Sequence, residues 1–109
     1  MAELDDDTGP TGSVEIVLDD AGNAVVRITG EVDMANADSL EATIAPILTM
    51  RSEQLVFDVG DLDFMDSSGI ALLLRCAKKV GTVRLRHPSP IIRRTVETMG
   101  LANVLHLDP

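Results

Sequence analysis

Residues 55–74 read Leu-Val-Phe-Asp-Val-Gly-Asp-Leu-Asp-Phe-Met-Asp-Ser-Ser-Gly-Ile-Ala-Leu-Leu-Leu, and this stretch decides the fold of the chain. Its apolar start predicts a buried strand over 54–59, and its apolar end predicts a helix. Between them lies an acidic loop, followed by Ser67, Ser68 and Gly69. The N–H groups and the dipole of a helix start favour negative charge there. The residues alone leave three roles open for such a serine: phosphate acceptor, nucleophile or plain helix cap.

The helix that follows the two serines is predicted over 67–80. Asp66 is a suitable N-cap residue, and Gly81 is a suitable residue just beyond the end. Lys78 and Lys79 fall in the last turn, where cations are favoured. The apolar residues at helical spacing are Ile70, Leu73, Leu74 and Ala77.

On the N-terminal side, the pattern predicts a hairpin and then a helix. Strands over 14–18 and 24–29 flank turn residues at 19–23, and residues 30–33 close the pair. A helical pattern begins at about Asn36, and Pro46 is expected to bend or end it. Residues 1–12 are expected to form a flexible acidic tail.

On the C-terminal side, a strand is predicted over 82–86, a helix after Ser89 and a last strand over 104–107. Pro90 suits the first helical position, and Gly100 suits the helix end, with Leu101 placed for an apolar contact. The order β-β-α-β-α-β-α-β predicts a single α/β domain over residues 13–109. We expect a mostly parallel central sheet, an antiparallel first strand pair and about three helices.

Composition limits the function. The chain has 109 residues, a net charge of −9, two Phe and no Trp or Tyr, which disfavours nucleic-acid binding. Residues 1–66 carry 16 acidic and 2 basic side chains, whereas 67–109 carry 2 acidic and 7 basic ones. This asymmetry indicates either an acidic face for a basic protein surface or solubility alone.

The single cysteine, Cys76, excludes an internal disulfide and a cysteine-based metal site, and its apolar neighbours indicate buried packing. No secretory h-region opens the chain, and no apolar run reaches the ~20 residues that span a bilayer. These features predict a soluble cytoplasmic protein without membrane insertion.

Enzymatic chemistry has little support in the sequence. A nucleophilic serine needs a base, but His87 and His106 accompany no Gly-x-Ser-x-Gly elbow. His87 is expected in a loop and His106 at an edge strand. No Walker-type or Gly-x-Gly-x-x-Gly loop indicates a nucleotide site. We therefore expect no enzyme and no cofactor.

The clustered carboxylates also predict no metal site. Their spacing is not that of a calcium loop, and Asp58 belongs to the predicted strand, so a solvated acidic loop is favoured. A receiver-type phosphoacceptor at Asp58 is disfavoured because Asp19 and Asp20 fall in the hairpin turn and the chain does not open with a βαβ unit. The clustered carboxylates are Asp58, Asp61, Asp63 and Asp66.

Three segments resemble the STAS domain, and most closely the bacterial anti-sigma factor antagonists. They are Gly30-Glu31-Val32-Asp33, then Asp61-Leu62-Asp63-Phe64-Met65-Asp66-Ser67-Ser68-Gly69-Ile70, and finally Ser89-Pro90 through Met99-Gly100-Leu101. The likeness spans about residues 13–107, and Phe-Met-Asp-Ser-Ser-Gly is its most specific part.

This resemblance implies a partner switch that regulates transcription, as in stress responses or sporulation. The unphosphorylated antagonist binds an anti-sigma factor, which is a serine kinase of the GHKL type, and so frees the sigma factor. The kinase uses ATP to phosphorylate the position of Ser67, and a PP2C-type phosphatase reverses this. Asp66 matches the aspartate beside the acceptor, and Asp33 matches the loop aspartate packed next to it. The implied partner-binding residues are Gly30, Glu31, Asp33, Asp63, Phe64, Met65, Asp66, Ser67, Ser68 and Gly69.

The chain departs from the family pattern in three places, and a second function is considered beside the first. The residues after Asp33 are less polar than expected, the acidic segment 3–7 has no family counterpart, and the final C-terminal helix is expected to be missing or short. The alternative is an unphosphorylated STAS subunit of a membrane transport or signalling complex. Such a subunit would be indifferent to substitution of Ser67.

Overall fold

The computed structural model describes residues 12–49 and 54–108, and within them one mixed sheet carries the fold. Its strand order is β1-β2-β3-β5-β6, with β4 pairing β2 beyond the end of β3. β1 and β2 are antiparallel, and every other pairing is parallel. The strands are β1 Ser13–Leu18, β2 Ala24–Val32, β3 Gln54–Asp58, β4 Leu62–Met65, β5 Thr82–Arg86 and β6 Leu105–Leu107.

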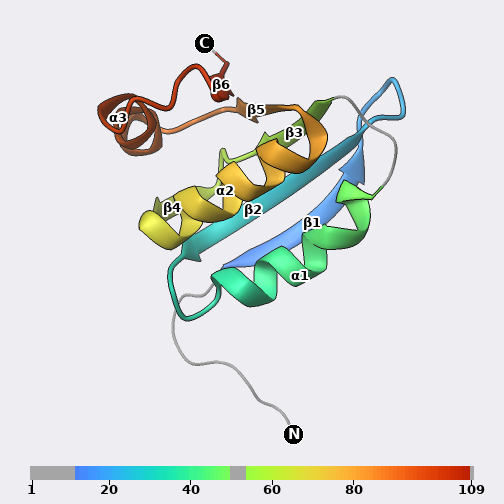
Figure 1. The fold of residues 1–109 in the computed structure, drawn as a ribbon. Helices are drawn as coiled ribbons and strands as arrows, with labels where there is room; N and C mark the ends of the chain where they lie inside the picture. The colour runs from blue at the N-terminus through green and yellow to red at the C-terminus, as the bar shows by residue number, and fades with distance from the viewer. Residues whose placement is uncertain (1–11, 50–53, 109) are drawn as a thin grey trace, which may run out of the picture.

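Three helices follow the parallel strands: α1 Ala37–Leu48, α2 Ser67–Val80 and α3 Pro90–Thr98. α1 and α2 lie next to each other over one face of the sheet (Figure 1). Their apolar sides and that face of the strands form the aliphatic core around Phe57, the aromatic residue within it. Cys76 is fully buried there, as expected for a packing residue.

The predicted helix ends are confirmed. Asp66 caps α2, and Ser89 Oγ caps α3 by accepting the Ile92 N–H at 3.3 Å, with Pro90 in the first turn. At the end of α3, Gly100 adopts a φ of 73°, and the Leu101 N–H donates to the Val96 carbonyl at 3.0 Å. This is the Schellman pattern, and Leu101 packs against the core as predicted.

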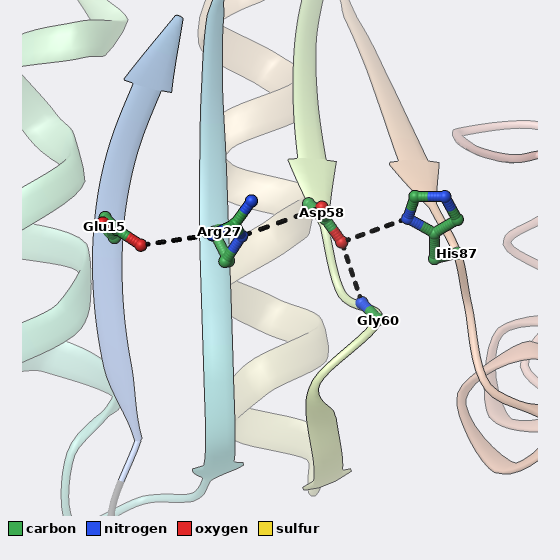
Figure 2. A network of polar contacts seen from close by, with 5 residues as sticks. All are labelled: Glu15, Arg27, Asp58, Gly60 and His87. Carbon is green, nitrogen blue, oxygen red and sulfur yellow. Dashed lines mark hydrogen bonds and ion pairs between the residues drawn. The ribbon is translucent and has the colours of Figure 1, made fainter. Parts of the chain in front are cut away.

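The opposite face of the sheet carries a row of charged side chains. Arg27 of β2 lies 3.4 Å from Glu15 of β1 and 3.8 Å from Asp58 of β3. Asp58 also accepts the Gly60 N–H at 3.0 Å, and His87 Nδ1 lies 3.4 Å from the same oxygen. Figure 2 shows these side chains in front of the strands, with helices behind. Asp58 therefore fixes the bend through which β3 leads into β4.

Three predictions about the elements were wrong. Residues 62–65 form β4 instead of belonging to a solvated loop, because their backbone pairs with the end of β2. For the same reason β2 extends to Val32, three residues beyond the predicted end. The last strand begins at Leu105, since Val104 belongs to a turn. Pro46 lies inside α1 as expected; of the two effects expected of it, it does not end the helix, which runs two residues further, to Leu48.

The predicted tail over 1–12 lies outside the described residues except for Gly12, so it stays a prediction. Within 12–49 and 54–108, α3 is the last helix. None of the described helices is long and apolar enough to cross a membrane.

Candidate functional site

Two of the segments singled out in the sequence, residues 30–33 and 61–70, lie side by side at one end of the sheet. In the parallel ladder between β2 and β4, Glu31 pairs with Phe64, and Val32 pairs with Met65. The Asp66 N–H then donates to the Val32 carbonyl at 3.1 Å, which continues the contact to the start of α2. In Figure 1 the end of β2 and the starts of α1 and α2 meet at the lower left. Residues 30–36 and 61–69 therefore form one surface.

Ser67 is the first residue of α2, and its side chain is exposed. Asp66 Oδ1 accepts the Ser68 N–H at 2.8 Å. This capping bond uses a backbone N–H of the helix and does not involve the Ser67 hydroxyl. No residue within 12–49 and 54–108 hydrogen-bonds that hydroxyl. Ser68, by contrast, is half-buried. Ser67 is thus the more accessible of the two serines.

The loop after β2 is held by Asn36, a residue that the sequence analysis did not select. Its Nδ2 donates to the Glu31 carbonyl at 2.8 Å, and its Oδ1 accepts the Asp33 N–H at 3.0 Å. Asp33 Oδ1 in turn accepts the Ala35 N–H at 2.9 Å. Asn36 makes no capping bond of its own at the start of α1, so its side chain serves the loop. The only signal in the sequence was an asparagine at a helix start, which usually means a cap.

Gly69 and Met65 lie beneath the exposed residues of the site, on the side of the core. Both are buried, and a Cβ on Gly69 would lie 2.7 Å from Met65 Cβ and 3.2 Å from Val32 Cγ1. Only a glycine lets α2 approach the β2–β4 ladder this closely. These two residues of the predicted partner-binding set therefore face the core, where they position the exposed members.

The exposed part of the site combines carboxylates with apolar side chains. Asp63 is exposed, while Glu31, Asp33 and Asp66 are half-buried around Ser67. Phe64 is 46% exposed, and Met34 is 81% exposed. Exposed aromatic and methionine side chains are enriched at protein interfaces. An acidic rim with apolar contact points can bind a protein surface.

The two histidines and the two serines belong to different elements of the fold. His87 lies beside Asp58 on the open sheet face, and His106 is in the edge strand β6, as predicted. Neither histidine hydrogen-bonds Ser67 or Ser68 in the described part of the chain. Without a base, a serine hydroxyl is a poor nucleophile.

Asp58 is the member of the carboxylate cluster in the sequence whose contacts are defined most fully. Asp58 is directed to the open sheet face by its contacts with Arg27, Gly60 and His87 (Figure 2). Burial by itself would raise the pKa of Asp58, but the Gly60 N–H, His87 and Arg27 outweigh it and lower that pKa below its ordinary value. No group of three or more His, Cys, Asp or Glu side chains in the described ranges is arranged to hold a metal ion.

The fold and the paired segments define a class of protein. Residues 15–109 match the STAS domain, and the chain belongs to this family. The predicted fold class, with its antiparallel first pair and three helices, is confirmed.

Within this family, the chain is similar to proteins that are named anti-sigma factor antagonists. The chain is 29% identical over 103 residues to the anti-sigma-F factor antagonist RsfB of Mycobacterium tuberculosis, covering 92% of this chain and 84% of RsfB. A crystal structure of an anti-sigma factor antagonist from Mycobacterium paratuberculosis superposes with a TM-score of 0.81 at 27% identity, covering 91% of this chain and 86% of that one.

The fold also matches SpoIIAA in both its forms. The unphosphorylated form gives a TM-score of 0.73 at 22% identity, with 89% of each chain covered. The phosphorylated form, from Bacillus, gives 0.66 at 22% identity, with 89% of this chain and 92% of that chain covered. At this identity the likeness shows the shared fold.

Proposed function

We propose that this chain is an anti-sigma factor antagonist switched by phosphorylation of Ser67. The unphosphorylated form binds an anti-sigma factor that is a GHKL-type serine kinase and thereby releases a sigma factor. The kinase phosphorylates Ser67 with ATP, binding is lost, and a PP2C-type phosphatase restores the active form. The observation that carries this proposal is the exposed Ser67 hydroxyl, free of described partners, on a helix start capped by Asp66. All of these partners act in the cytoplasm.

The names of the relatives support the partner class. RsfB and the protein from Mycobacterium paratuberculosis are both named anti-sigma factor antagonists. SpoIIAA is known in phosphorylated and unphosphorylated forms of the same fold. In this chain, Ser67 lies in the same family-typical segment that carried the resemblance.

The charge around Ser67 explains how a phosphate acts without refolding the domain. A phosphate adds about −1.5 to −2 charges, which the start of a helix tolerates or favours. The same group repels acidic contacts of the partner, adding to the carboxylates of Asp33, Asp63 and Asp66, and it fills interface volume. Phosphorylation therefore blocks the contact surface for the partner, while the start of α2 remains helical.

The proposed contact surface consists of the exposed and half-buried members of the predicted set. Phe64 supplies apolar area, and the carboxylates supply the acidic rim. Gly30, Met65 and Gly69 hold the backbone that presents them. The members that meet the partner are Glu31, Asp33, Asp63, Phe64, Asp66, Ser67 and Ser68.

Binding of two Ser67 variants to the anti-sigma kinase of the same organism tests the proposal. We expect Ser67→Ala to bind like the unphosphorylated protein even after incubation with ATP, and Ser67→Asp to bind at least about tenfold more weakly, a loss of ~1.4 kcal/mol. Ser89→Asp is the matched control, since it adds the same charge at the cap of another helix. Equal, tight binding by Ser67→Asp and Ser67→Ala would contradict the switch and favour a constitutive structural subunit.

A further inference from the structure

A groove of about 350 Å³ lies between α1 and α2, next to the proposed phosphoacceptor. Ser68, which follows Ser67 directly, lines this groove and connects it to the surface described above. The lining residues are Met34, Ala37, Asp38, Ser68, Ala71 and Arg75.

The walls of the groove are suited to the aliphatic part of a long side chain. Ala37 and Ala71 are small, so α1 and α2 leave space between them at this point. Met34 is 81% exposed and lies at the groove with a flexible, unbranched side chain. Methionine adapts its shape to an inserted group and is common at binding surfaces.

Arg75, the cation among the lining residues, is already paired with Glu41, so Asp38, Glu41 and Arg75 together carry a net negative charge beside the groove. Arg75 Nε donates to Glu41 Oε1 at 3.0 Å and to Oε2 at 3.1 Å, and this hydrogen bonding lowers the pKa of Glu41. Asp38 is exposed and forms no hydrogen bond or ion pair with any residue in the described ranges. Asp38 therefore keeps a carboxylate without a hydrogen-bonded or ion-paired partner in the groove, although its charge, after the Glu41 hydrogen bond, also helps to raise the pKa of Arg75.

We infer that this groove receives a long cationic side chain, Arg or Lys, of the anti-sigma factor, an inference that rests on the proposed function. The stem packs against Met34 and the two alanines, and the charged head reaches Asp38. An apolar side chain would bury the Asp38 carboxylate unpaired, which is costly, and an acidic one would be repelled.

The test measures the affinity of the unphosphorylated protein for the anti-sigma kinase by calorimetry. Ala71→Leu fills the groove, and we expect binding at least about tenfold weaker. Ala42→Leu is the matched control, because Ala42 is exposed on α1 and does not line the groove. Met34→Ser removes one wall at a position that is 81% exposed, and it is expected to weaken binding about threefold or more without affecting folding.

The cationic nature of the occupant is tested by salt. Asp38→Asn should weaken binding about fivefold at 50 mM NaCl, and this difference should shrink at 500 mM NaCl because salt screens the ion pair. Asp20→Asn, in the hairpin turn, is the control and should bind like the original chain. An Asp38→Asn effect absent at both salt concentrations would exclude a cationic occupant.

The outcomes separate the groove from the proposed function. If Ser67→Asp loses binding while Ala71→Leu and Met34→Ser bind within about twofold of the original chain, the groove is not occupied and the inference is overturned. If Ser67→Asp binds normally, the proposed switch itself fails, whatever the groove variants do. Weak binding by Ala71→Leu and Met34→Ser, with normal binding by Ala42→Leu, supports the groove.

Discussion

Gly69 shows at the scale of one residue how the site constrains the sequence. Alanine in a helix interior is usually better than glycine by about 1 kcal/mol. Here the new Cβ would lie 2.7 Å from Met65 Cβ, an atom that no side-chain rotation can move. We expect Gly69→Ala to lower the free energy of unfolding by about 1–3 kcal/mol.

Urea unfolding followed by circular dichroism measures this change. Gly22→Ala is the comparison, since the φ of Gly22 is 85° but nothing lies near its Cβ position. A Gly69→Ala protein more stable than the original chain would show that α2 does not pack this closely on the β2–β4 ladder.

Cys76 is a second residue whose environment makes a prediction. Burial, reinforced by Glu41, raises the pKa of its thiol to about 11, although the nearby cations lower it slightly. Because the thiolate is the reactive form, very little of it is present at pH 8. We expect iodoacetamide to leave Cys76 unmodified in the folded protein and to modify it fully in 8 M urea, as measured by intact mass. Rapid alkylation without urea would contradict the buried position.

At the scale of the element, α2 depends on its cap. Asp66 satisfies the Ser68 N–H, so Asp66→Ala should cost about 0.5–2 kcal/mol of stability. Asp66→Asn keeps an acceptor at the same place and should cost less. Chemical denaturation of the two variants distinguishes the roles. An equal loss for both would mean that the charge near the helix dipole, and not the cap bond, carries the effect.

The elements with regular sequence patterns could be predicted. A short element that forms only by pairing with a distant strand could not. α2 had both caps and a helical apolar stripe in its own sequence, so its bounds were found. β4 has two buried ends around the exposed Asp63 and Phe64, without alternation, and it exists through its ladder with β2. A short strand stabilised by a distant partner leaves no periodic signal.

Some residues of the site could also be predicted from the sequence, whereas others could be found only in the folded structure. The exposed Ser67 and the neighbouring Asp33 loop followed from a family-typical segment. Asn36 acts through contacts with Glu31 and Asp33 that only the folded loop creates. The α1–α2 groove joins residues that are some thirty positions apart in the sequence, such as Asp38 and Ala71, so no local pattern marks it.

At the scale of the whole molecule, two carboxylates link stability to pH. The pKa of Asp58 is lowered despite its burial, by Gly60, His87 and Arg27, and that of Glu41 is lowered by its hydrogen bond to Arg75. A lowered pKa in the folded state adds stability above the unfolded value of about 4, and this stability is lost as pH falls through the folded value. The free energy of unfolding should therefore fall between about pH 5 and pH 3.

Urea unfolding at pH 5, 4 and 3 measures this slope. Asp58→Asn and Glu41→Gln should each show a smaller decrease than the original chain, because each removes one linked proton. Identical slopes for all three proteins would mean that neither carboxylate is held as described.

The most direct test of the central claim is to locate the phosphate. The chain is incubated with the proposed anti-sigma kinase and ATP, and tandem mass spectrometry of the peptide around 61–75 assigns the modified residue. We predict a single phosphate on Ser67, and none on the Ser67→Ala protein. A phosphate on Ser68, or phosphate incorporation that persists in Ser67→Ala, would contradict the assignment of Ser67 as the switch.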